Sequence, residues 1–153
     1  MSVFLKLLIS VVCICKHVYM KSMEVSGFYK CMSDPQRIRI LALLVEGPLC
    51  VCHLAEILEM DQVRLSKQLR YLKDQGTVTA ERQAQWMIYR VAEPVVVLLS
   101  ENLEQLRELD GVELPLNLDG VKREHLAERI SKGESGCSSE VQELLGSFGK
   151  EAV

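Results

Sequence analysis

Residues 49–76 read LCVCHLAEILEMDQVRLSKQLRYLKDQG and carry two helical patterns in succession. The first half places apolar side chains on one helix face, and in the second half Leu65, Leu69 and Leu72 recur at intervals of four and three residues. Asp61, between the two, is a residue type that caps helix N-termini, and the closing glycine is a type that ends helices. Two short helices joined by a tight turn are typical of a helix-turn-helix, whose second helix can enter a DNA major groove.

The flanking sequence predicts a larger domain around this pair of helices. Helical patterns cover residues 25–32 and 35–46, and the second begins at an Asp-Pro pair that favours a helix start. After the pair, β-rich runs at 77–80 and 86–91 predict a hairpin, although the polar residues between them lack an Asn-Gly turn. A long helix lined with leucines follows over residues 94–109. This order predicts a mainly α fold with a β-hairpin wing, that is, a winged helix-turn-helix domain.

Charge is distributed unevenly along a chain whose formal net charge is −3 and whose pI is ≈ 5.7. Residues 61–90 hold six lysines and arginines against three acidic residues, whereas residues 91–153 hold six against thirteen. An acidic chain of this kind is not a purely electrostatic nucleic-acid binder. The local basic excess fits a DNA-binding face, and it fits equally well a chance fluctuation on a solvated surface.

The N-terminal segment differs from this central domain, which we expect over residues 23–110. Residues 1–22 form an N-terminal extension whose uncharged and mainly apolar run, residues 7–15, is nine residues long, whereas a membrane-spanning helix needs about 20. The extension could be a secretory leader, or translation could begin downstream at Met20 or Met23.

The C-terminal segment, residues 111–153, is predicted to form an acidic and partly mobile tail. Helical patterns occur within it at 119–130 and 139–145. Because the apolar run in residues 1–22 is too short to span a membrane, we expect a cytoplasmic protein without a membrane partner; the alternative of a membrane-tethered protein depends wholly on those residues.

The second helix of the pair has a polar face suited to phosphates and base edges. The side chains expected to contact the DNA groove are Gln62, Arg64, Ser66, Lys67, Gln68 and Arg70. In the wing, we expect Arg82 and Gln85 to contact the DNA backbone or the minor groove. The alternatives are an amphipathic helix whose polar face is only solvated, and a protein-interaction module without DNA binding. No Ser/His/acid set, paired-carboxylate site or glycine-rich phosphate loop points to an enzyme.

Six cysteines include two pairs at C-x-C spacing, Cys13/Cys15 and Cys50/Cys52. Their density is below that of a disulfide scaffold, and without a clear leader we expect reduced thiols. Thiolates are soft ligands that select thiophilic ions. Residues two apart on a regular helix point about 200° apart, so Cys50 and Cys52 can share an ion only if the start of that helix is distorted.

The box LCVCHL, residues 49–54, resembles the L-C-V-C-D-L metal-binding box of the ArsR/SmtB metalloregulators. The surrounding sequence supports this resemblance. SDPQRIRIL at 33–41 is similar to the family's S-D-x-x-R-x-x-I-L opening, LSKQLRYLKDQG at 65–76 is similar to its recognition helix, and residues 81–90 are similar to its wing. The resemblance covers residues 25–109.

The sequence departs from the family pattern at several positions. His53 replaces the usual Asp of the box, Gln68 replaces a common His of the recognition helix, and Ala55 stands where some arsenic sensors carry a third cysteine. The wing turn lacks the usual glycine. Residues 94–110 lack the acidic and histidine pairs with which the family can build a zinc site on its last helix.

The resemblance implies a homodimeric transcriptional repressor, paired through its first and last helices, that binds an inverted-repeat operator in double-stranded DNA. It also implies that arsenite or antimonite binds at Cys50 and Cys52 as an inducer, deforms that helix, shifts the recognition helix and releases the DNA. The candidates for a third ligand are Cys137, Cys31, Cys13, Cys15 and His53. The alternatives are a cadmium-, lead- or zinc-responsive repressor that uses the N-terminal cysteines, and a regulator switched by thiol oxidation.

Overall fold

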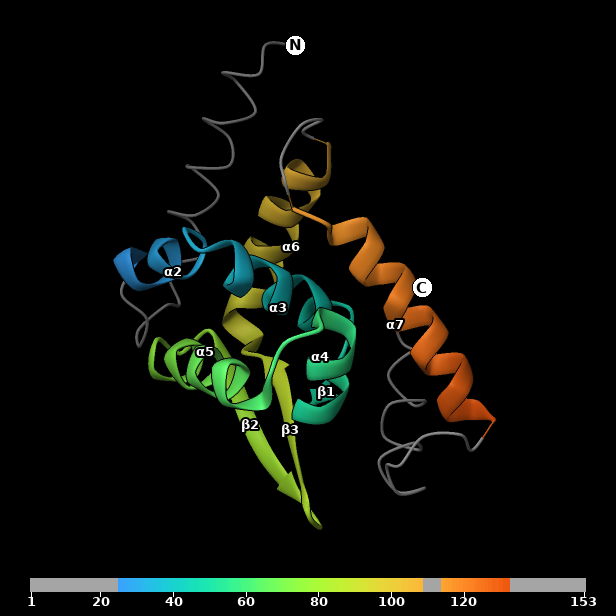
Figure 1. Ribbon diagram of the computed structural model, residues 1–153. Helices are drawn as coiled ribbons and strands as arrows, with labels where there is room; N and C mark the ends of the chain where they lie inside the picture. The colour runs from blue at the N-terminus through green and yellow to red at the C-terminus, as the bar shows by residue number, and fades with distance from the viewer. Residues whose placement is uncertain (1–24, 109–113, 133–153) are drawn as a thin grey trace.

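The computed structural model describes residues 25–108 and 114–132 (Figure 1). The elements, in chain order, are α2 (Val25–Cys31), α3 (Pro35–Val45), β1 (Leu49–Cys50), α4 (Val51–Leu58), α5 (Gln62–Asp74), β2 (Val78–Gln83), β3 (Trp86–Val91), α6 (Glu93–Glu108) and α7 (Leu116–Ser131). The strands pair antiparallel in the order β1–β3–β2. The predicted winged helix-turn-helix fold is confirmed, with α4 and α5 as the helix-turn-helix and the β2–β3 hairpin as the wing.

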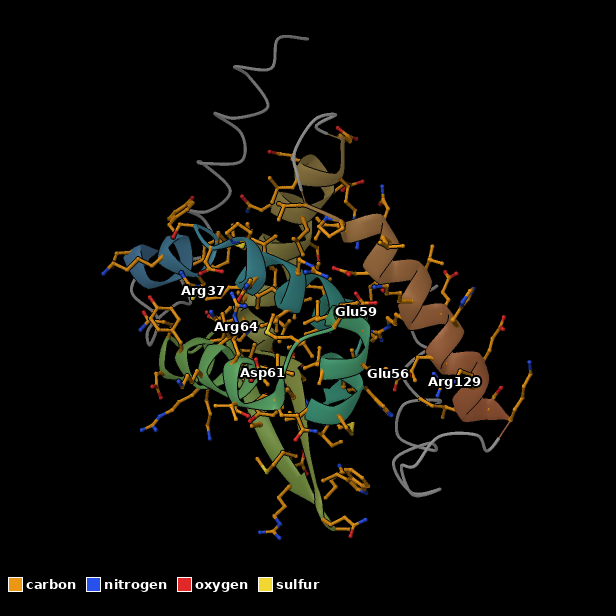
Figure 2. The ribbon with its side chains drawn as sticks, in the orientation of Figure 1. Arg37, Glu56, Glu59, Asp61, Arg64 and Arg129 are labelled. Carbon is orange, nitrogen blue, oxygen red and sulfur yellow. A yellow bond between two sulfur atoms is a disulfide. The ribbon has the colours of Figure 1, made fainter. Side chains whose placement is uncertain are left out.

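Capping side chains explain where α3 and α5 begin. The Asp34 carboxylate accepts hydrogen bonds from the backbone N–H groups of Gln36 and Arg37, at 2.8 and 3.2 Å, and a proline stands at the helix start. Asp61 accepts a hydrogen bond from the backbone N–H of Arg64 at 2.8 Å, at the start of α5 (Figure 2). Both helix starts were predicted from the sequence.

The helix-turn-helix packs through the apolar faces that the spacing predicted. Leu65, Leu69 and Leu72 of α5 are fully buried and share one core with Leu54 and Ile57 of α4. Burying each such side chain stabilises the fold by about 1.5–3 kcal/mol. The hairpin extends away from this core (Figure 1), so its tip is held at a distance from the helices.

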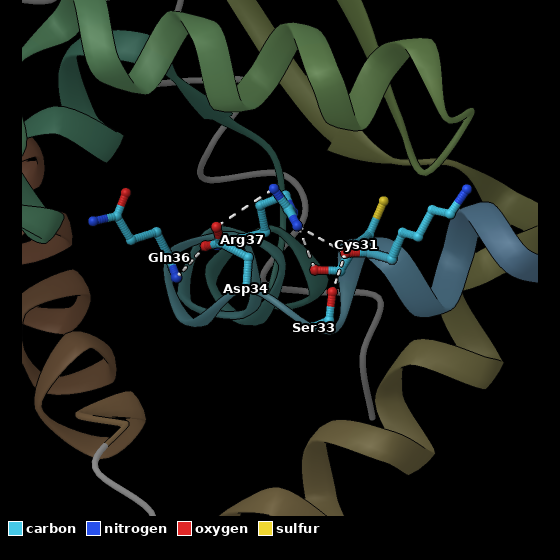
Figure 3. A network of polar contacts seen from close by, with 6 residues as sticks. Cys31, Ser33, Asp34, Gln36 and Arg37 are labelled. Atoms are coloured by element: carbon cyan, nitrogen blue, oxygen red, sulfur yellow. Dashed lines mark hydrogen bonds and ion pairs between the residues drawn. The ribbon is translucent and has the colours of Figure 1, made fainter.

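Arg37 links the end of α2 to the start of α3 and to α5. Its guanidinium donates to the backbone carbonyls of Lys30 and Cys31, at 2.8 and 3.3 Å, and pairs with Asp34 at 3.4 Å (Figure 3). The same group lies over the ring of Tyr71, 4.6 Å from its centroid. Because Tyr71 belongs to α5, these contacts join α5 to the two helices α2 and α3.

The first helix of the pair begins later than predicted. The sequence predicted a helix from residue 49, but Leu49 and Cys50 form strand β1, which pairs with Tyr89 and Ile88 of β3. A strand of two residues leaves no periodic pattern in the sequence. The inner strand of the wing, β3, is therefore hydrogen-bonded to β1, which directly precedes α4.

The wing itself is tighter than predicted. Strand β2 continues to Gln83, which pairs with Trp86, so residues 81–83 of the predicted loop belong to the strand. Ala84 and Gln85 alone form the turn, and Ala84 adopts a left-handed φ of 50°. The polar composition of this segment therefore reflects an exposed strand and not a long loop.

The C-terminal helix α7 packs against α3 and α4 (Figure 1). Its buried side chains are Leu116, Asp119, Leu126 and Ile130. At its far end Arg129 forms an ion pair with Glu56 of α4 (Figure 2). The first part of the segment that the sequence predicted as a tail is thus a helix packed on the domain, and it contains the helix predicted over residues 119–130.

Two sequence predictions concern residues that lie outside the described ranges: the N-terminal extension over 1–22 and the short helix at 139–145. Within residues 25–108 and 114–132, every helix is too short or too polar to cross a bilayer.

We expect Asp119→Ala to lower the free energy of unfolding by about 2–3 kcal/mol, because removing one partner of a buried ion pair leaves the other charge poorly compensated. Asp119 is 1% exposed and accepts two hydrogen bonds from Arg39, at 2.7 and 2.8 Å. Chemical denaturation of the variant measures the loss. Lys122→Gln is the matched control on the same helix, and we expect it to cost far less, since its partner Glu59 is exposed and an exposed ion pair contributes little. Equal losses in the two variants would contradict the prediction.

Candidate functional site

Cys50 and Cys52 meet at the start of α4. Cys50 ends β1 and is the N-cap of α4, with an extended backbone (φ −81°, ψ 162°), whereas Cys52 lies in the first helical turn. Because Cys50 precedes the helix, the angular spacing of helical side chains does not apply to the pair. Their sulfurs are joined in a disulfide, with 5.5 Å between the two Cα atoms. The expectation that the two sulfurs can meet only if the start of the predicted helix is distorted or unwound agrees with this backbone, since Cys50 is extended and the helix begins at Val51. The expectation of reduced thiols does not hold for this pair in the structure.

The pair is tied directly to the wing. Cys50 is the register partner of Ile88 on β3, and both are 1% exposed. Cys52 and Trp86 pack against these two side chains in a small apolar cluster. A movement of the two sulfurs would therefore displace β3, the inner strand of the wing, as well as α4. Sequence reasoning missed this second connection because β1 is too short to leave a signal.

His53 is buried beside the two sulfurs. Its side chain is 2% exposed, and neither ring nitrogen has a hydrogen-bond partner among the described residues. The imidazole nitrogen and the sulfurs of Cys50 and Cys52 all lie within 4.8 Å of one another. The backbone N–H of His53 also donates to the Cys50 sulfur at 3.4 Å.

Burial lowers the pKa of His53 below its ordinary value, and the neighbouring Glu56 carboxylate opposes this shift only in part. The imidazole is therefore neutral near pH 7 and keeps a nitrogen lone pair that could bind a metal ion. The fold turns the His53 side chain into the interior, next to the two sulfurs.

The other predicted ligands lie apart from this cluster or outside the described residues. Cys31 is fully buried in α2, belongs to the main core and contacts the Thr77 hydroxyl at 3.4 Å. Burial raises the pKa of its thiol, despite opposing effects of Thr77 and Arg37, so it stays protonated. Cys13, Cys15 and Cys137 fall in the segments that the structure does not describe.

The recognition helix presents a polar face to solvent. The exposed members of the predicted set are Gln62, Arg64, Ser66, Lys67 and Arg70, whereas Gln68 is half-buried. A shallow hollow on this face is lined by Gln62, Val63, Ser66, Lys67 and Arg70. Val63 is 68% exposed and was missed by sequence reasoning. Its position in the sequence, on the same helix face as the polar residues, could have revealed it. An exposed apolar side chain on this face is suited to contact the methyl group of a thymine.

The two predicted wing residues lie at the tip of the hairpin. Arg82 and Gln85 are both exposed, and Arg82 donates to the Ala84 carbonyl at 3.2 Å across the turn. This bond holds the guanidinium near the tip, where the wing extends furthest from the helices (Figure 1).

Comparison with known proteins gives matches to bacterial regulators. The family model described as "Bacterial regulatory protein, arsR family" matches residues 34–80. The "Arsenic resistance transcriptional regulator ArsR1" of Pseudomonas putida is 39% identical over 64 residues, which are 41% of this chain and 50% of that protein. The "Arsenical resistance operon repressor" of Staphylococcus xylosus is 32% identical over 87 residues, which are 57% of this chain and 84% of that one.

A solved structure matches over the same region. The homodimeric winged helix-turn-helix DNA-binding domain Mb0332 of Mycobacterium bovis, a possible ArsR-family regulator, aligns with a TM-score of 0.52 and 30% identity. The alignment covers 55% of this chain and 79% of that domain. The matched relatives are transcription regulators and not enzymes, which agrees with the prediction from the sequence.

Proposed function

The chain belongs to the arsR family of bacterial regulatory proteins, and from this premise we propose that it is a transcriptional repressor released from its operator when a thiophilic ion binds Cys50 and Cys52. The observation that carries the proposal is the convergence of these two sulfurs at the entry to the helix-turn-helix. Arsenite and antimonite are the proposed inducers, because both favour thiolate ligands. Relatives named for arsenic resistance support this choice.

Ion binding can act on the DNA-binding elements by two routes. The first runs through α4 to α5, which are joined by a tight turn in which Glu59 adopts a left-handed φ of 52°. The second runs through β1 to β3, because Cys50 pairs with Ile88. A coupling of about 3 kcal/mol along these routes would lower operator affinity more than a hundredfold.

The proposed operator is an inverted repeat bound by a homodimer, with half-sites about one helical turn apart or a multiple of that. The helices proposed to pair the subunits are α2 and α6. Each carries an exposed apolar side chain, Tyr29 on α2 (48% exposed) and Val97 on α6 (68% exposed). The proposed DNA contacts are those of Gln62, Arg64, Ser66, Lys67, Gln68 and Arg70 in α5, and of Arg82 and Gln85 in the wing.

Fluorescence anisotropy of a labelled duplex from upstream of the protein's own gene tests the proposal. We expect the reduced protein to bind tightly and with strong salt dependence, and arsenite to release the DNA at near-stoichiometric amounts. Release of the DNA by cadmium but not by arsenite would mean that the inducer is a divalent metal ion. DNA binding that neither ion disturbs would overturn the sensing part, and absence of binding to a panel of upstream duplexes would overturn the repressor itself.

A second candidate function is a repressor switched by thiol oxidation, which the Cys50–Cys52 disulfide favours. In this case two thiols lose two electrons and two protons to an oxidant such as hydrogen peroxide, which is reduced to water. We expect oxidised and reduced protein to differ in operator affinity without any ion. Equal affinity of the two forms would exclude this candidate.

For the repressor that responds to an ion, we expect arsenite to act on the reduced protein alone, because the disulfide withholds both thiolates from the ion. Protein treated with peroxide should keep its operator complex when arsenite is added. A phosphine reductant, which does not chelate arsenite as a dithiol would, should restore the response. Arsenite release from the fully oxidised protein would show that another ligand set carries the response.

A further inference from the structure

We propose that His53 completes, with Cys50 and Cys52, a Cys2His site for a divalent d10 cation such as Cd²⁺ or Zn²⁺, held by a single subunit. The inference rests on the proposed function, since it extends the ligand set and the ion class of the same switch. It assigns the third ligand to a residue beside the pair and not to the N-terminal cysteines or to Cys137.

The first observation is the arrangement of the donors. One sulfur from each cysteine and one ring nitrogen of His53 lie within 4.8 Å of one another. In a tetrahedral Zn²⁺ site, bonds of about 2.3 Å to sulfur and 2.0–2.1 Å to nitrogen separate the donor atoms by roughly 3.5–3.8 Å. Opening the disulfide lets the two sulfurs move apart to such a spacing, so only small side-chain movements separate the present arrangement from a site.

The second observation is the state of His53 itself. The side chain is 2% exposed, and both ring nitrogens lack a hydrogen-bond partner among the described residues. A buried polar group without a partner is costly, by about 1–3 kcal/mol, and so requires an explanation. A metal ion bound to one nitrogen would provide it.

The third observation is the chemistry of the donor set. Arsenite is satisfied by thiolates and gains little from nitrogen, whereas Zn²⁺ and Cd²⁺ accept a mixed set of sulfur and imidazole. Binding exchanges two thiol protons for the cation and involves no electron transfer. It therefore requires the reduced pair, which a cellular dithiol or a phosphine would supply from the disulfide. The fourth tetrahedral position is left to water.

The test measures Cd²⁺ affinity of the reduced full chain by competition with a chelator. We expect His53→Gln to weaken Cd²⁺ binding by about 100-fold or more, because losing a direct ligand should cost at least as much as losing a residue that only orients a ligand, for which the range is about 10–100-fold. Arsenite affinity should change by no more than about threefold, since thiolates alone hold that ion. His125→Gln, on the exposed face of α7, is the matched control and should change neither affinity.

A second readout does not depend on any variant. In the wild-type protein with ¹⁵N-labelled histidine, we expect one imidazole nitrogen of His53 to shift on Cd²⁺ binding and to show coupling to ¹¹³Cd. An unshifted imidazole in the loaded protein would overturn the proposal, as would an unchanged Cd²⁺ affinity in His53→Gln. Thermal unfolding of the metal-free variant checks that it folds.

The outcomes separate this inference from the proposed function. If Cys50→Ser abolishes ion binding and His53→Gln does not, the thiol switch stands and the third ligand is wrong. If Cd²⁺ binds through His53 but neither Cd²⁺ nor arsenite releases the DNA, the site stands and the proposed function fails.

Discussion

Cys50→Ser is expected to abolish release of the operator by arsenite while leaving operator affinity in the absence of arsenite unchanged. In the wild-type protein, saturating arsenite should weaken DNA binding by about a hundredfold or more. In the variant, the same titration should leave the anisotropy flat. The reason is chemical: a serine hydroxyl does not ionise near neutral pH and is a hard oxygen ligand, so the ion loses one of its two soft ligands.

The structure makes this a conservative change for the fold. The Cys50 sulfur caps α4 by accepting a hydrogen bond from the backbone N–H of His53. Serine is among the preferred N-cap residues, so its hydroxyl can accept the same bond. Loss of the arsenite response in Cys50→Ser would therefore report the missing thiolate and not a damaged helix.

Cys31→Ala is the matched control for this experiment. It removes a buried thiol that lies in α2 and outside the cluster of Cys50, Cys52 and His53. We expect it to retain normal release by arsenite, with a modest loss of stability from the smaller side chain. The proposal is wrong if arsenite still releases Cys50→Ser from the DNA at wild-type concentrations.

The sequence predicted the order of the elements because each has a strong local signal. Asp34 and Asp61 are capping residues at the starts of α3 and α5, and the leucines of α5 recur at helical spacing. Apolar periodicity reports which face of a helix is buried, and this is decided within one or two turns of the chain. The recognition helix and most of its exposed face could therefore be predicted, although Val63 was missed and Gln68 is half-buried.

The geometry of the candidate metal site could not be predicted in the same way. The extended backbone of Cys50 depends on pairing with Ile88, which is 38 positions further along the chain. The burial of His53 likewise depends on the fold, because the residue type alone does not decide whether a histidine is buried. The position of α7 on α3 rests on Arg39 and Asp119, 80 residues apart. No local pattern encodes contacts over such separations.

Lys67→Ala combined with Arg70→Ala is expected to weaken operator binding by about a hundredfold at moderate salt. Both side chains are exposed on the face of α5 that lines the hollow described above. In a homodimer the double variant removes four positive charges from the DNA-facing surface. If each neutralises one phosphate, the slope of log affinity against log salt should become less steep by about 3 to 4.

The salt dependence distinguishes a phosphate contact from an indirect effect, because damage to the fold would weaken binding without changing the slope in this manner. Substitutions of exposed side chains usually alter stability by about 0.5 kcal/mol or less, so the unfolding curve should stay close to that of the wild type.

Lys73→Ala supplies the matched control: it removes an exposed charge from the last turn of the same helix. In a helix-turn-helix it is the N-terminal part of the recognition helix that contacts base edges, so the control should retain nearly full affinity and slope. Equal effects per charge removed in the control and in the double variant would mean that α5 contributes only its net charge, and that its N-terminal half does not lie in the groove.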